Sequence, residues 1–137
     1  TLRVAAGIEN NFNFYTKTLC SLSIGLFVKD IITGVQKFVE SPETSPKFVL
    51  YSGHDNTLSP LLCGFELLKT EHPVMGSTLA FEVWENTATD SDDRYHVRVV
   101  FNNRVLNLPG SDIYHFCPLA EFEKQAATLI PDNYAEQ

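Results

Sequence analysis

The stretch KFVLYSGHDNTLSPLL, residues 47–62, changes character midway. It opens with a short apolar run at 48–51, which has the composition of a β-strand. Two small residues follow, and then His54 and Asp55 stand side by side before apolar residues resume. The resumed apolar segment predicts a helix. A strand that leads directly into a helix is typical of an α/β fold.

The residues before this stretch predict an amphipathic helix over 22–39, because apolar side chains recur there every three or four positions. The connector at 40–46 holds two prolines and several cap-forming residues, so we expect it on the surface. The order helix, connector and strand then places 47–51 inside a sheet that has helices on its faces.

The residues after it predict an antiparallel extension of the sheet. Residues 78–85 and 95–101 each alternate apolar and polar side chains, and the acidic run between them is typical of a hairpin loop. A helical pattern returns at 119–130 and is stopped by Pro131. The predicted fold class is therefore α/β, in one segment that covers residues 1–137.

Composition excludes several classes of function. Ten basic against 17 acidic residues give a net charge of −7, which disfavours nucleic acid as a partner. The longest apolar stretches are shorter than the ~20 residues of a membrane-spanning helix, so we expect no such span. The three cysteines have no C-x-x-C spacing, and no nucleotide-binding glycine motif occurs, so we expect neither a metal nor a cofactor.

The junction at His54 and Asp55 has the chemistry needed to hydrolyse a phosphomonoester. Ligands of α/β sheets gather beyond the carboxyl ends of strands, where the next helix points its free N–H groups and positive dipole end. We expect that helix to be capped by Thr57 or by Ser59 with Pro60. A histidine there can donate hydrogen bonds to phosphate oxygens, and a neighbouring carboxylic acid can protonate a departing alkoxide.

Two other interpretations of this junction stay open. The pair could be a helix cap beside a histidine that is bonded to the backbone. A metal-dependent phosphohydrolase would need further histidine ligands, and the three remaining candidates lack a spacing that would bring them together: His72, His96 and His115.

Four motifs in the same order resemble the histidine acid phosphatases, a branch of the histidine phosphatase superfamily that includes prostatic and lysosomal acid phosphatases. YSGHDNTLSPLL at 51–62 is similar to the second signature of that family, and MGSTLAFEVWE at 75–85 to its glycine-serine strand. VRVVFNNRVLNLPG at 97–110 resembles its hairpin strand and LPG turn, and residues 117–137 resemble its C-terminal helix.

The resemblance implies a three-layer α/β/α domain with a mixed sheet, and hydrolysis of a phosphomonoester substrate through a phosphohistidine intermediate. His54 matches the histidine that binds the phosphoryl group, and Asp55 matches the proton donor. The nucleophile motif R-H-G-x-R-x-P is missing from the chain, so the resemblance implies the C-terminal part of a longer enzyme whose N-terminal part is a partner. A noncatalytic phosphate-binding or interaction module of the same fold is the alternative.

Further expectations follow from the resemblance and the pattern. The resemblance implies a secreted protein or one in the lysosomal or endomembrane lumen. We expect uncovered apolar surface, and hence either self-association of the isolated segment into a homo-oligomer or folding as part of the intact protein. Trp84 is expected in the core and Glu82 in solvent or at a cap, while Met75–Gly76–Ser77 either line the pocket or only form a turn. Ser111 follows the LPG turn in place of a cysteine, which leaves Cys117 without the partner usual in the family.

Overall fold

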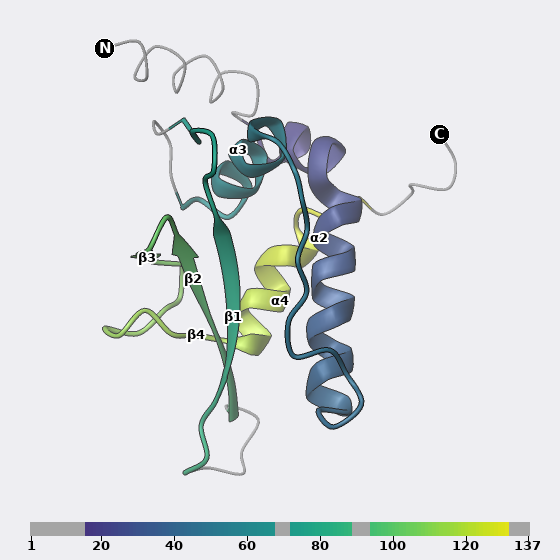
Figure 1. Cartoon of the computed structure of the whole chain (residues 1–137), viewed down its shortest axis with the longest axis vertical. Coiled ribbons are helices and arrows are strands. Elements are labelled where there is room, and N and C mark those ends of the chain that lie inside the picture. Colours follow the sequence, from purple (N-terminus) through teal and green to yellow (C-terminus); the bar gives the residue numbers. More distant parts are fainter. Residues whose placement is uncertain (1–15, 68–71, 89–93, 132–137) are drawn as a thin grey trace.

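A computed structural model describes residues 16–67, 72–88 and 94–131 of the chain. Two helices come first, and a small sheet and a last helix follow. The elements are α2 (Lys17–Glu40), α3 (Asp55–Gly64), β1 (Leu79–Glu85), β2 (Tyr95–Phe101), β3 (Arg104–Leu106), β4 (Cys117–Pro118) and α4 (Leu119–Ala127). Figure 1 shows α4 lying between the sheet and α2. The α/β class is confirmed.

Helix α2 confirms the helix predicted at 22–39 and begins five residues earlier. Thr16 caps it, since its hydroxyl oxygen accepts a hydrogen bond from the N–H of Leu19 at 3.2 Å. After Glu40 the N–H of Ser41 donates to the carbonyl of Lys37 at 2.9 Å, and the chain turns. Buried residues recur along one face at helical spacing: Cys20, Ile24, Val28 and Ile32. This face packs on α3 and α4.

Helix α2 also has the length and apolar composition of a membrane-spanning helix. That is weak evidence for a span, because the core helix of a globular domain meets the same two conditions.

The sheet confirms the predicted antiparallel pair. Strands β1 and β2 pair with Val83 opposite Val97, and β3 and β4 both pair with β2, also antiparallel. The predicted hairpin loop falls partly on residues 89–93, which lie outside the described residues. The mixed, three-layer sheet expected from the resemblance stays a prediction about the larger domain.

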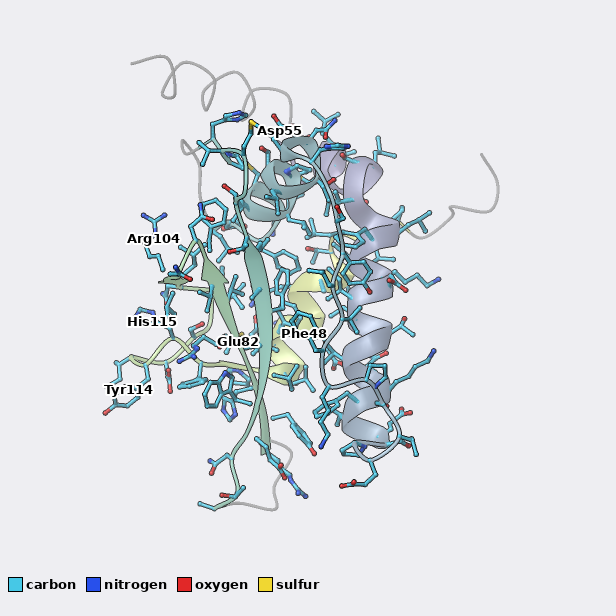
Figure 2. All side chains as sticks on the ribbon, viewed as in Figure 1. Phe48, Asp55, Glu82, Arg104, Tyr114 and His115 are labelled. Carbon is cyan, nitrogen blue, oxygen red and sulfur yellow. The ribbon has the colours of Figure 1, made fainter. Side chains whose placement is uncertain are left out.

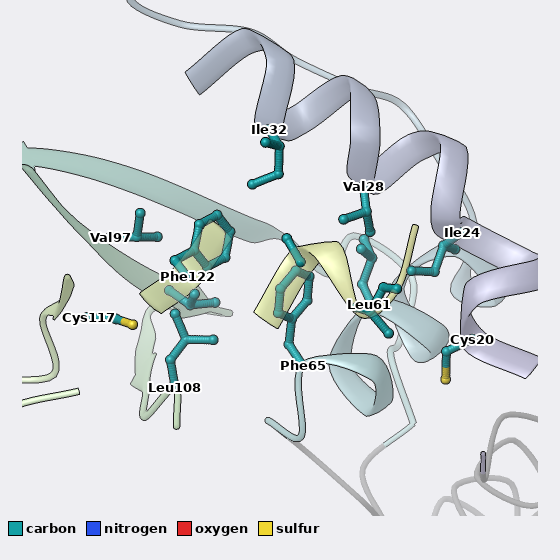
Figure 3. Close-up of a cluster of buried hydrophobic side chains, with 13 residues drawn as sticks. Cys20, Ile24, Val28, Ile32, Leu61, Phe65, Val97, Leu108, Cys117 and Phe122 are labelled. Atoms are coloured by element: carbon teal, nitrogen blue, oxygen red, sulfur yellow. The ribbon is translucent and has the colours of Figure 1, made fainter. Parts of the chain in front are cut away.

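The core fills the space between β2 and the helices. Alternate residues of β2 are buried, as strand periodicity requires. Val97 and Val99 belong to the same core cluster as Phe122 and Ala126 of α4, and Phe101 packs in a second cluster with Leu62 and Leu106. Phe122 stacks on Phe65, just after α3, with ring centroids 5.3 Å apart, and it also contacts Phe81 of β1 at 5.7 Å. Figure 3 shows Phe65 and Phe122 between the sheet and α2. These aromatic contacts join α3, α4 and the sheet.

The prediction that 47–51 is a strand inside a sheet is wrong for the described structure. These residues run back alongside α2 without entering a strand ladder, as Figure 1 shows. Phe48 and Leu50 are each 80% exposed. Tyr51 does contact α2, because its hydroxyl donates to Asp30 Oδ2 at 2.6 Å and its ring meets Phe27 edge-on. The apolar run has strand composition, but the described residues supply no neighbouring strand for its backbone.

Replacing Leu50 by lysine should reduce self-association of the 137-residue chain. The exposed apolar residues at 48–51 would otherwise associate with the same residues of a second copy, and a charge at Leu50 opposes that burial. Sedimentation velocity over a range of concentrations measures the effect.

Ile113→Lys is the matched control, since Ile113 is 84% exposed in the loop before β4. It should leave the sedimentation coefficients as in the unmodified chain. An equal effect of both substitutions, or a chain that is monomeric at all concentrations, would contradict the prediction.

Cys117 forms no disulfide within the described residues. The residue is fully buried, with Sγ 3.7 Å from the carbonyl oxygen of Pro109. Burial, assisted by the nearby carboxylate of Glu121, raises the pKa of the Cys117 thiol to about 11. The group is therefore a neutral core thiol at physiological pH.

Cys117 should resist alkylation in the folded chain. At pH 8 we expect iodoacetamide to modify it at least about a hundredfold more slowly than in guanidinium chloride, because the thiolate is the nucleophile and is scarce at that pH. Peptide mass spectrometry after timed quenching gives both rates. Equal rates in the folded and unfolded chain would show that Cys117 is not held as a buried thiol.

Candidate active site

The candidate site begins at the N-terminus of α3. His54 is the N-cap residue through its backbone, whose extended conformation presents the carbonyl to the N–H groups of Thr57 and Leu58 at 3.0 and 3.2 Å. The expected caps at Thr57 or at Ser59 with Pro60 are wrong, because all three residues lie inside the helix. The helix starts earlier than its apolar pattern because the His54 carbonyl already closes the first turn.

His54 and Asp55 both present exposed side chains at this helix end. The His54 imidazole makes no capping hydrogen bond, so its ring nitrogens are not used to close the helix. Asp55 is the acidic residue of the first turn, where a carboxylate is favoured by the helix dipole. Its Oδ1 accepts a hydrogen bond from the N–H of Asn56 at 2.9 Å. Figure 2 shows Asp55 at the α3 end of the molecule.

These residues form one wall of an open cavity of about 830 Å³. The α3 end contributes Gly53, His54, Asp55 and Leu58, and the facing wall is the segment from His72 to Ser77. Both interpretations of Met75–Gly76–Ser77 are confirmed: these residues line the cavity and also form a turn, in which Gly76 has a φ of 76°.

A bonded turn fixes this second wall to the sheet. The N–H of Val74 donates to the Ser77 hydroxyl at 2.9 Å, and the N–H of Ser77 donates to the carbonyl of Val74 at 3.0 Å. The side-chain amide of Asn102, at the end of β2, donates to the same hydroxyl at 3.2 Å and accepts from the N–H of Thr78 at 2.9 Å. The cavity thus lies between a helix end and a turn that is anchored on the sheet.

His72 is the cavity residue that sequence reasoning missed. Its Nε2 lies 3.6 Å from Oδ2 of Asp55, although 16 residues separate the two in the chain. The His72 side chain is 23% exposed and that of Asp55 is 55% exposed. No local pattern marks His72 as a cavity residue, because its position depends on the turn at 74–77 that Asn102 holds.

The other candidates lie away from the cavity. Trp84 is 45% exposed, so its expected place in the core is wrong. The alternation of β1 puts it on the same face as Glu82, where Glu82 Oε2 accepts from the Trp84 indole at 3.1 Å and from Arg98 Nε at 2.8 Å. The guanidinium of Arg98 lies over the Trp84 ring at 4.6 Å. This group stabilises the outer face of the sheet.

The three further histidines are not brought together. His96 lies on β2 with its ring 6.5 Å from that of Phe116, and His115 Nδ1 is 3.1 Å from Asn107 Oδ1. Neither residue lines the cavity that contains His72. Within 16–67, 72–88 and 94–131, no group of three histidine, cysteine or acidic residues has a metal-binding arrangement.

Comparison with known proteins identifies the family of this chain. The family model of the histidine phosphatase superfamily, branch 2, matches residues 7–102, which include His54, Asp55 and both walls of the cavity. The chain belongs to this superfamily. The match supports the predicted resemblance to histidine acid phosphatases.

Several relatives of this chain are named acid phosphatases. A probable acid phosphatase of Dictyostelium discoideum is 32% identical over 134 residues, which is 85% of this chain and 28% of the relative. A second one from the same organism is 30% identical over 90% of this chain and 31% of its own length. Prostatic acid phosphatase of Rattus norvegicus is 26% identical over 82% of the chain and 29% of its own length. The chain thus spans less than a third of these relatives.

Proposed function

We propose that this chain supplies the phosphate-binding histidine and the proton donor of an acid phosphatase that hydrolyses phosphomonoesters through a phosphohistidine. The observation that carries the proposal is the cavity wall at the start of α3, where the His54 imidazole takes no part in capping and Asp55 stands beside it. The matched family and the names of the relatives support the reaction class.

His54 is suited to hold the phosphoryl group. The imidazole is exposed on the cavity wall at a helix N-terminus, where the free N–H groups and the dipole favour an anion. A ring N–H of His54 can donate to a phosphoryl oxygen, and this bond gains strength as charge builds on that oxygen in the transition state. Because the backbone carbonyl alone caps the helix, ligand binding by the ring leaves α3 intact.

Asp55 is suited to protonate the leaving oxygen. A protonated carboxyl group transfers its proton to the departing alkoxide, which leaves as an alcohol, and Asp55 becomes a carboxylate. In the second step the same carboxylate can take a proton from the water that attacks phosphorus. One residue thus serves as acid and then as base.

The nucleophile and the arginines of the phosphate clamp are proposed to come from a part of the protein outside these 137 residues. The chain contains no R-H-G-x-R-x-P motif. Of the three arginines in the described ranges, Arg98 pairs with Glu82, Arg94 pairs with Glu85 at the end of β1, and Arg104 lies on β3; none of them lines the cavity. We further propose a secreted or lysosomal location for the complete protein, as the names of the prostatic and lysosomal relatives favour.

In the complete protein, Asp55→Asn should slow turnover of alkyl phosphates by about 10²–10⁴-fold and that of aryl phosphates much less. An alkoxide needs a proton in order to leave, whereas a phenolate with electron-withdrawing groups does not. Measuring kcat over a series of leaving groups gives the dependence.

Glu43→Gln is the control, since Glu43 is an exposed carboxylate in the connector after α2. It should leave kcat unchanged for every ester. Equal losses for alkyl and aryl esters in Asp55→Asn would remove Asp55 from the proposed acid role.

Residues 1–137 alone should not turn over phosphomonoesters. Phosphoryl transfer depends mainly on positioning and charge stabilisation, which one histidine and one acid cannot supply without a nucleophile and a clamp. The test incubates the purified chain with an aryl phosphate at acid pH and analyses acid-quenched peptides for phosphohistidine. Turnover, or phosphate attached to His54, His72, His96 or His115, would place the nucleophile inside this chain.

A further inference from the structure

The two oxygens of the Asp55 carboxyl group have different surroundings. Oδ1 accepts the N–H of Asn56 at 2.9 Å, so a lone pair of this oxygen is already engaged. Oδ2 has the imidazole of His72 as its neighbour, with Nε2 at 3.6 Å. A protonated carboxyl carries one hydrogen, and an oxygen that accepts an N–H bond is the less favoured place for it. The proton that Asp55 would donate therefore belongs on Oδ2, beside His72.

Two contacts within the described part of the chain hold the Asp55 side chain. Its side chain is 55% exposed, and the described contacts hold it only at Oδ1 and through His72. A terminal carboxyl torsion is broad, so a half-exposed aspartate samples many orientations. General-acid catalysis needs the proton within hydrogen-bond reach of the leaving oxygen, and small displacements reduce the rate strongly. A neighbour that restricts Oδ2 consequently affects the reaction.

His72 is held more firmly than the carboxyl group it faces. Its side chain is 23% exposed, and Pro73 restricts the backbone that follows it. The next residues form the turn that hydrogen bonds fix to Asn102 and thus to the sheet. The His72 imidazole therefore faces Asp55 of α3 from the segment 72–77, which hydrogen bonds fix to the sheet.

We propose that His72 is a positioning residue for Asp55, which keeps Oδ2 directed into the cavity for proton transfer to the leaving group. This inference rests on the proposed function and adds a residue to its site. At 3.6 Å the contact is longer than a direct hydrogen bond but within the range of an ion pair.

The test compares alkyl and aryl phosphates in the complete protein that contains this segment. His72→Ala should lower kcat for alkyl phosphates about tenfold, the size of a typical coupling between residues in contact, and for aryl phosphates less than about twofold. His72→Gln, whose side-chain amide oxygen can accept a hydrogen bond near the position of Nε2, should restore part of the alkyl rate. His96→Gln is the matched histidine control and should leave both rates unchanged.

A double-mutant cycle shows whether His72 acts through Asp55. In an Asp55→Asn background, His72→Ala should cause no further loss with alkyl phosphates, because the acid that it positions is gone. The inhibition constant of inorganic phosphate should stay within about twofold in His72→Ala, since phosphate binding does not use the Asp55 proton. A general disturbance of the cavity would change that constant.

The two proposals fail in different ways. If Asp55→Asn shows the leaving-group dependence but His72→Ala slows both ester classes equally, or adds its full effect to Asp55→Asn, the positioning role is overturned and the proposed function stands. If Asp55→Asn itself shows no leaving-group dependence, the acid role fails and the positioning role falls with it. If circular dichroism shows that His72→Ala is unfolded, the same comparison of alkyl and aryl phosphates is made with His72→Gln and His72→Asn.

Discussion

The aromatic contact between Phe65 and Phe122 is the interaction on which the site depends most. Phe65 follows the last turn of α3, and Phe122 belongs to α4, which packs directly on β2. Both rings also contact Phe81 of β1, at 5.6 and 5.7 Å. The C-terminal end of α3 is thereby fixed to the sheet, so the direction of the helix and the place of its N-terminus are set by buried aromatic packing. The positions of His54 and Asp55 therefore depend on this aromatic contact.

The second wall of the cavity depends on the sheet through polar contacts instead. Asn102 adopts a positive φ of 48° at the turn between β2 and β3, and its side chain bonds both Thr78 and Ser77. An asparagine tolerates this left-handed conformation better than most residues. The turn that carries His72 toward Asp55 is therefore tied to the same β2 strand that carries α4. Both walls of the cavity, the N-terminus of α3 and the turn at 74–77, are therefore positioned by the same strand, β2.

The sequence was sufficient where one local pattern decides the structure. The periodicity of α2 and the alternation at 79–85 and 95–101 reflect burial on one face, which a single segment reveals by itself. The same alternation assigns Trp84 to the face of Glu82 rather than to the core. The error there came from residue type being given more weight than strand parity. The junction at His54 and Asp55 was located because the helix start, the small residues and the family motif coincide.

Features that depend on residues far away in the sequence could not be predicted from a local sequence pattern. The run at 48–51 has strand composition, yet a strand exists only with a neighbour to share its hydrogen bonds, and composition does not say whether one is present. His72 had no periodicity to mark it. Its contact with Asp55 results from the position of the turn at 74–77, which depends on Asn102 some 25 residues further along the chain. The contact between His72 and Asp55, which depends on such a turn, can be recognised only in the three-dimensional structure.

The charge around the cavity limits what this part of the protein can do alone. The chain carries a net charge of −7, and the described residues of the cavity walls are two histidines, one aspartate and otherwise apolar or small residues. A phosphate monoester brings about two negative charges, which need fixed positive partners within a few ångströms. Arg94 and Arg98 lie on the sheet beside acidic residues, where their charge is already balanced. In the proposed enzyme, His54 and the dipole of α3 therefore complete a phosphate site whose main positive charge comes from another part of the protein, while Asp55 and His72 act on the side of the leaving group.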